Sequence, residues 1–312
     1  MRVELRGPAG ILECLTHGIR RKGWAALLSI FCIASGAECT VASGSAAATD
    51  AAGGAIPGTA ELAAPIRDNS FLVEEAYNQE ASVVQHISNF VFFHDSRDWA
   101  STFTQEWPFR GQKHQLSYTL TMADPGRLGG ETGQGDTLLN YRYQVAGGGP
   151  ERVAFAPRVS LVLPTGDEKA ARGQGAYGFL INLPLSVEYA PRLVGHSNAG
   201  AVHLFSAENN TGEEADLTDY FLGQSLIWLA RPDFNLMLEA FWASGEEVAG
   251  PGLTDRSSSF FLNPGLRWAI NLPSGLQIVP GVAAPIGLGS SKGQEALFLY
   301  LSFEHPFGRS PR

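Results

Sequence analysis

Three absences limit what this chain can be. All three cysteines, Cys14, Cys32 and Cys39, lie near the N-terminus, so neither a disulfide framework nor a thiolate metal site can form in the rest of the chain. No hydrophobic run reaches the roughly 18 residues typical of a transmembrane helix. Charged residues make up only 17% of the chain, against about 25% in soluble globular proteins. A low charge content, together with the lack of a membrane-spanning hydrophobic run, fits a β-sheet whose outer surface is in contact with lipid.

The N-terminal region has the pattern of an export signal. A basic cluster at 20–22 precedes an apolar stretch at 24–37, which is too short for a membrane-spanning helix. We predict a signal peptide and export region over residues 1–48, and a flexible periplasmic linker over 49–70. Removing the net +2 of residues 1–48 from the formal −9 leaves about −11, which argues against a nucleic-acid partner.

Strand-like stretches recur after the linker, and none of these segments shows a long amphipathic helical pattern. Most are close to the length of about 9–11 residues that a tilted transmembrane strand needs. They cover roughly residues 83–93, 99–107, 115–122, 137–145, 152–163, 178–190, 193–205, 218–230, 234–243, 259–271, 276–286 and 296–307. The predicted fold class is all-β, an antiparallel transmembrane β-barrel of about 12 strands over residues 71–312.

The connections between these stretches alternate in length. Short ones such as AGGGP and APR alternate with long ones such as PTGDEKAARGQGAYG, SAENNTGEEAD and SGEEVAGPGLTDRS. Outer-membrane barrels have short periplasmic turns and longer extracellular loops. HDSRD, the first connection, is short where a long loop is expected. The alternation as a whole predicts a barrel in the bacterial outer membrane, in contact with its lipid and lipopolysaccharide.

Two faces can be separated within single strands. In VAFAPRVSLVLPTGD, residues 153–167, one parity is apolar, and the other is small or polar apart from Val162. The C-terminal strand ALFLYLSFEHPF has a similar apolar parity and comes near the end of the chain, at Phe307. Outer-membrane proteins commonly end in such a strand, which the barrel assembly machinery recognises. In lipid the apolar parity must face outward, so the polar parity faces a lumen.

Several motifs together carry a family resemblance. GDTLLNYRY, PRVSLVLPTGD, GHSNAG and NPGLRWAINLPSGLQIVPGVAAPIG resemble the outer-membrane barrels of the phenol-degradation meta-pathway family, over about residues 115–307. The resemblance implies a transporter-like, porin-like barrel of Gram-negative bacteria that passes hydrophobic or aromatic small molecules. The resemblance indicates the fold more than the substrate, because the shared motifs are structural and not catalytic.

Inward-facing polar residues are the candidate solute path. We place three arginines and three glutamates there, together with an amide and a hydroxyl: Asn140, Arg142, Arg158, Ser160, Glu188, Glu239, Arg267 and Glu304. Opposed charges in a constriction can orient a polar solute. The same groups can instead pair with one another and close a narrow barrel. The sequence leaves both possibilities open, since it does not fix the heights of these residues.

No catalytic residue, metal site or cofactor is predicted. His86 and Ser88 share a strand face, as in the His-x-Ser motif of outer-membrane phospholipase A, but no downstream Asn completes such a motif. Lipid hydrolysis at this pair is the alternative function. The acidic stretch 208–219 lacks the spacing of a calcium loop, and an adhesive barrel acting through acidic loops is a further alternative. Residues 71–87 are polar for a spanning strand and are expected to form a periplasmic or plug segment.

Overall fold

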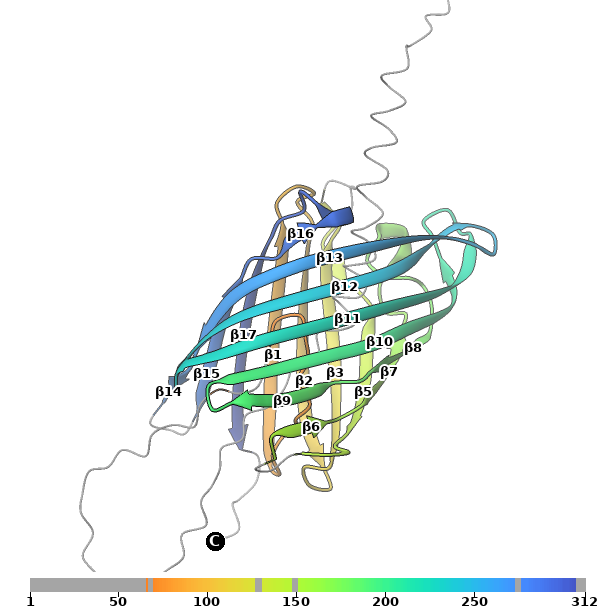
Figure 1. Ribbon diagram of the computed structural model, residues 1–312. Coiled ribbons are helices and arrows are strands. Elements are labelled where there is room, and N and C mark those ends of the chain that lie inside the picture. Colours follow the sequence, from red (N-terminus) through yellow and green to blue (C-terminus); the bar gives the residue numbers. More distant parts are fainter. Residues whose placement is uncertain (1–65, 67–69, 127–130, 148–150, 273–275, 307–312) are drawn as a thin grey trace, which may run out of the picture.

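The computed structural model describes Ile66 and residues 70–126, 131–147, 151–272 and 276–306. They form one closed antiparallel barrel of 12 strands (Figure 1). The spans are β1 (Val83–Phe93), β2 (Trp99–Phe109), β3 (His114–Asp124), β4 (Gly133–Gln134) with β5 (Thr137–Tyr143), β6 (Val153–Phe155) with β7 (Arg158–Leu163), β8 (Gly178–Asn182) with β9 (Leu185–Ala190), β10 (Leu193–Glu208), β11 (Glu214–Arg231), β12 (Phe234–Gly250), β13 (Leu253–Trp268) with β14 (Ile270–Asn271), β15 (Gln277–Ala283) with β16 (Ile286–Leu288), and β17 (Ala296–Pro306). Two short 3₁₀ turns, η2 (Glu168–Ala170) and η3 (Gly289–Ser291), lie in connections.

The first and last strands close the barrel. β1 pairs with β17 along its whole length, from Val83 opposite Pro306 to Phe93 opposite Ala296, and with β2 on its other edge. Three spans are interrupted beside Pro157, Pro184 and Pro285. Proline has no N–H to donate to the ladder, so these breaks follow from the sequence. Closure leaves no free sheet edge, which is the condition for a sheet to lie in lipid.

The outer face of the barrel is apolar. Large hydrophobic side chains on many of its strands are exposed, among them Leu116, Leu120, Met122, Leu139, Val159, Phe179, Ile181, Leu222, Leu226, Leu238, Leu299 and Leu301. A monomeric soluble protein rarely shows so large a contiguous apolar surface. The belt confirms the predicted direction of the apolar parity, because Val153 and Val159 are exposed while Ala154, Arg158 and Ser160 are buried.

Four strands are longer than the sequence indicated. The predicted loops SAENNTGEEAD and SGEEVAGPGLTDRS are mostly strand: β10 runs to Glu208, β11 begins at Glu214, and only residues 251–252 separate β12 from β13. The resulting hairpins project beyond the rest of the barrel (Figure 1). Pairing between β11 and β12 stops at Tyr220 and Ser244. The carboxylates of Asp219 and Glu246 then accept backbone N–H bonds across the gap, so these acidic residues act as strand partners as well as surface charges.

Part of the prediction falls outside the described residues. The export region 1–48 lies there, as do most of the linker 49–70 and Phe307. Ile66 and Ser70, at the end of that linker, are described and lie buried inside the barrel.

Among the residues that the structure describes, no helix has the length and apolar character needed to cross a membrane.

The apolar belt yields a stability prediction. Leu222→Arg places a charge on the outer face, where Leu222 is 53% exposed, and should lower the free energy of unfolding in phospholipid bilayers by about 2–4 kcal/mol. Leu253→Arg is the matched control, because Leu253 is 64% exposed at the tip of a projecting hairpin, and it should change that free energy by less than about 1 kcal/mol. Urea titration of both variants measures the difference. Equal losses would contradict the assignment of the belt to lipid.

Candidate functional site

The candidate site begins with two arginines that strand pairing brings together. Arg142 on β5 lies directly opposite Arg158 on β7, and Arg158 lies opposite Asn182 on β8. All three side chains face inward and are buried. Two adjacent guanidinium groups removed from water need a counter-charge. No acidic residue occupies the described stretches of these three strands, so the counter-charge must come from elsewhere.

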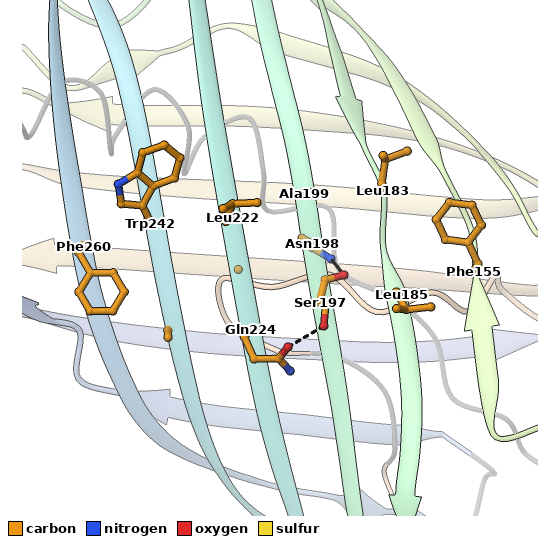
Figure 2. A pocket seen from close by; sticks show the side chains of 12 residues that line it. Phe155, Leu183, Leu185, Ser197, Asn198, Ala199, Leu222, Gln224, Trp242 and Phe260 are labelled. Atoms are coloured by element: carbon orange, nitrogen blue, oxygen red, sulfur yellow. Dashed lines mark hydrogen bonds between the residues drawn. The ribbon is translucent and has the colours of Figure 1, made fainter.

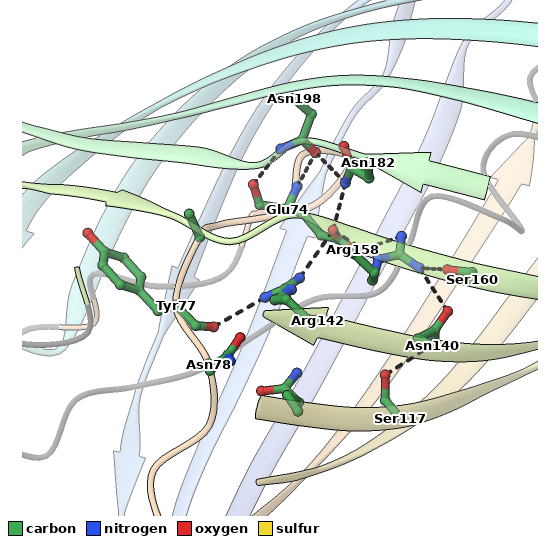
Figure 3. A network of polar contacts seen from close by, with 12 residues as sticks. Glu74, Tyr77, Asn78, Ser117, Asn140, Arg142, Arg158, Ser160, Asn182 and Asn198 are labelled. Carbon is green, nitrogen blue, oxygen red and sulfur yellow. Dashed lines mark hydrogen bonds and ion pairs between the residues drawn. The ribbon is translucent and has the colours of Figure 1, made fainter. Parts of the chain in front are cut away.

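The lumen is occupied by the chain that precedes β1. The lumen segment is defined as Ile66 together with residues 70–79, and Ile66, Ser70–Ala76, Asn78 and Gln79 are all buried. The segment is irregular in secondary structure and passes through the interior near the polar inner wall (Figure 3). Of the two expectations for 71–87, a periplasmic or a plug segment, the position of residues 71–79 inside the lumen agrees with the second. The rest of that range is different, because β1 begins at Val83.

Inward side chains of the wall bind the backbone of this segment. Asn198 is bidentate: its Oδ1 accepts from the Glu74 N–H at 2.7 Å and its Nδ2 donates to the Glu74 carbonyl at 2.7 Å. Gln144 likewise accepts from the Asn78 N–H and donates to the Ala76 carbonyl. Further backbone contacts come from Ser186, Gln115, Arg142 and Asn235. Side-chain amides thus satisfy polar groups that a strand partner would satisfy in a sheet.

Glu74 supplies the missing counter-charge (Figure 3). Its carboxylate oxygens lie 2.7 Å from a guanidinium nitrogen of Arg158 and 3.1 Å from one of Arg142. Asn182 donates to the same carboxylate at 2.6 Å. All the charged groups are at most 2% exposed, where charge-assisted hydrogen bonds are short and strong. One carboxylate therefore neutralises part of a doubly cationic wall.

An aromatic anchor holds the other end of the segment. The ring of Phe71 packs edge-on against Phe298 at 5.4 Å and Tyr300 at 6.2 Å between centroids. It covers Gly265 and Gly281, where an added Cβ would lie 2.4 and 2.9 Å from ring atoms. Glycine weakens a strand interior, and its presence at these two positions is explained by the room that the Phe71 ring needs. Any larger residue at Gly265 has to displace the ring.

Glu239 on β12 fixes the backbone beside that anchor. It accepts from the N–H groups of Phe71 at 2.9 Å and Leu72 at 3.0 Å. Asn263, opposite it on β13, donates at 2.8 Å. Within the described chain, Glu239 therefore has amide donors and no ion pair.

The predicted path residues divide between the middle and one end of the lumen. Asn140, Arg142, Arg158, Ser160, Glu239 and Arg267 are buried on the inner wall. Arg158 donates to both Asn140 and Ser160. Glu188 and Glu304 share the inward parity but are only half-buried, near the ends of β9 and β17. The two arginines that lie opposite each other both pair with Glu74 of the lumen segment.

Sequence reasoning missed most of the contacts that hold the segment. The residues concerned are polar, buried and on the inward-facing parity of their strands: Gln115, Gln144, Ser186 and Asn198. Their parity was the signal that could have placed them in the lumen. Their common partner, the backbone of 70–79, gave no signal, because nothing in a polar stretch of sequence indicates which wall it meets.

A folded connection covers the end of the barrel near β7 and β8. Both carboxylate oxygens of Asp136 accept backbone N–H bonds, from Gly166 and Gln174 at 3.0 Å each. Arg172 donates to Asp167 and to the Glu131 carbonyl. Ala176 belongs to a buried apolar cluster with Leu138, Val162, Leu180, Val202, Leu204, Ala207 and Leu217. The interior is therefore apolar at this end.

A groove of about 740 Å³ lies on the outer wall (Figure 2). Its lining is mostly apolar and comes from β6, from the β8–β9 junction and from β10 to β13. Its polar lining residues are Ser197, Asn198 and Gln224, and Ser197 donates to Gln224 at 2.6 Å. Gln224 also donates to the His196 and Ser225 carbonyls. Its polar atoms are thus satisfied internally, as lipid requires.

His86 and Ser88 lie outside the lumen. Both belong to the partly exposed outer parity of β1, and the His86 ring stacks on Phe303 at 4.6 Å and on His305 at 5.1 Å. In the described part of the chain, no three His, Cys, Asp or Glu side chains gather closely enough to hold a metal ion.

Comparison with known proteins shows likeness in fold. The solved structure of the COG4313 outer membrane channel from Pseudomonas putida F1 is similar with a TM-score of 0.60 at 12% identity, covering 73% of this chain and 96% of that one. A KdgM porin has a TM-score of 0.44 at 9% identity, over 70% and 98%. The CymD monoaromatic hydrocarbon channel has 0.37 at 11%, over 74% and 90%. No family model matches the sequence, and no curated protein matches it. The fold is that of an outer-membrane β-barrel.

The Glu74 contacts yield a prediction for the lumen segment. Glu74→Gln leaves Arg142 and Arg158 without their carboxylate, and breaking a buried ion pair costs about 3–5 kcal/mol. We expect chymotrypsin to cleave the segment after Phe71 or Tyr77 at least about 100-fold faster than in the unsubstituted protein. Glu80→Gln is the control, because Glu80 is half-buried beyond the buried stretch. Unchanged cleavage of the Glu74 variant would contradict the anchoring role.

Proposed function

We propose that this protein is an outer-membrane channel for small molecules, closed in this state by its own lumen segment, Ile66 and residues 70–79. One observation carries the proposal. The barrel strands pair with one another all the way round, whereas the lumen segment is held through side chains of the wall. The segment can therefore leave the lumen without breaking any strand-to-strand hydrogen bond. Water then replaces its contacts with Glu74, Glu239 and the wall amides.

The setting of the channel is part of the same proposal. Export by the signal peptide at 1–48, insertion by the barrel assembly machinery and contact with lipopolysaccharide are consistent with the apolar belt and the closed sheet. The likeness to a solved outer-membrane channel supports the fold that the proposal needs. No catalytic residue, metal or cofactor enters it.

The solute path would follow the polar inner wall. Once the segment has left, Arg142 and Arg158 on β5 and β7 face the lumen, and so does Glu239 on β12. Asn140 and Ser160 lie on the same two strands as the arginines. Arg267 lies on β13, which pairs with β12. Glu188 and Glu304 would stand at the end where they are half-exposed. The resemblance to the phenol-degradation family and the slot that seats Phe71 favour solutes with a hydrophobic or aromatic part.

A reversible lock tests the proposal directly. The hydroxyl oxygens of Ser70 and Ser225 are 2.9 Å apart, which suits a disulfide once both are replaced, and all native cysteines lie in the predicted export region. We expect the oxidised Ser70→Cys/Ser225→Cys protein to show no solute flux in liposome swelling, and reduction to restore the flux of the unsubstituted protein. A variant lacking residues 66–79 should swell liposomes fastest.

Two controls make the outcome decisive. Each single cysteine variant should behave as the unsubstituted protein under both redox conditions. If the variant without 66–79 remains impermeable while its gel mobility is still heat-modifiable, the barrel is folded and the channel proposal fails.

A further inference from the structure

The slot that seats Phe71 has the form of a ligand site. It lies on the inner wall where Gly281 on β15 is directly opposite Tyr300 on β17, and Gly265 on β13 forms its other side. Phe298 and Tyr300 supply its two rings, and the Cβ of Arg267 on β13, directly opposite Gly281, lies beside it. Two missing side chains between two aromatic rings leave a cavity shaped to one more ring.

Beside this slot lies the carboxylate of Glu239, which has no cationic partner among the described residues. Glu239 is fully buried, and its described donors are Asn263 and the amide N–H groups of the lumen segment. Glu74 differs, because it pairs with two arginines. When the segment leaves, Glu239 loses its amide donors from that segment, and a cationic group is the occupant that would bind it most strongly.

In Phe71 the aromatic ring and the backbone N–H donor are separated by the two carbon atoms Cβ and Cα. Its ring fills the slot, and its own backbone nitrogen donates to Glu239 at 2.9 Å. Ring, two carbon atoms and nitrogen are the skeleton of an arylethylamine. We propose that the vacated slot and Glu239 form a binding site for arylethylammonium cations, which Phe71 imitates in the closed state. This inference rests on the proposed function and names a solute class for it.

Competition follows from this overlap. Phe71 is tethered to the barrel, so it competes at a high effective concentration, and a free cation binds only to molecules whose segment has left. The compensating gain is a charge-assisted hydrogen bond to Glu239 in place of a neutral one. Bound cation and inserted segment exclude each other, so the cation favours the open state.

The experiment measures binding of 2-phenylethylammonium by titration calorimetry to the protein lacking residues 66–79. Ethylammonium, which has no ring, and 3-phenylpropanoate, which has a carboxylate in place of the ammonium, are the matched probes. We expect each to bind at least about tenfold more weakly, as does 2-phenylethylammonium to Glu239→Gln or to Gly265→Leu, which fills the slot. In the full chain, the oxidised Ser70→Cys/Ser225→Cys protein should bind none, and reduction should restore binding.

The outcomes separate this inference from the channel proposal. Equal affinity for the three probes, or unchanged affinity in any folded variant at Glu239 or Gly265, overturns the site, whatever the flux of neutral solutes. Selective binding that every folded variant weakens supports the site, even if liposome swelling shows no flux and the channel proposal fails. Heat-modifiable gel mobility identifies which variants are folded, and one folded variant is enough to decide.

Discussion

Glu74 meets two arginines that the barrel wall places face to face, and the closed state of the molecule depends on this contact. Strand register fixes Arg142 opposite Arg158, and burial makes two unpaired guanidinium groups costly. The carboxylate that neutralises them belongs to no strand. The charges of the wall are therefore balanced only when the lumen segment is in place. The residues that pair are far apart along the sequence.

The two parts of the molecule are held by different kinds of bond. The barrel is a continuous ladder of backbone hydrogen bonds closed between β1 and β17, and its outer face matches lipid. The lumen segment is held by side-chain amides, one ion-pair cluster and the Phe71 anchor. Water can replace its polar contacts, and its apolar contacts belong to Ile66, Phe71, Leu72 and Val73, whereas the backbone ladder in lipid has no such substitute. Movement is thus expected in the segment and rigidity in the wall.

Period-two alternation made the wall predictable. β1 and β2 begin at the predicted residues, the apolar parity of 153–163 faces outward, and Arg158 and Ser160 face inward. The prediction of long loops at 206–216 and 244–257 was wrong for all but residues 209–213 and 251–252, because the acidic and glycine-rich stretches around them continue as strands. There Asp219 and Glu246 bond backbone N–H groups between separated strands, a role that composition does not reveal. The path residues were placed on the right face, but their partners were not identified.

The sequence by itself determined which residues face lipid and which face the lumen, because that choice depends only on neighbours two positions apart on one strand. Tertiary structure decided what fills the lumen. The contacts of Glu74 with Arg142 and Arg158 span more than sixty positions along the chain, and those of Phe71 with Gly265 and Gly281 span nearly two hundred or more. Such contacts depend on strand tilt and register around the whole barrel, which fix the heights at which side chains meet and which no local pattern encodes.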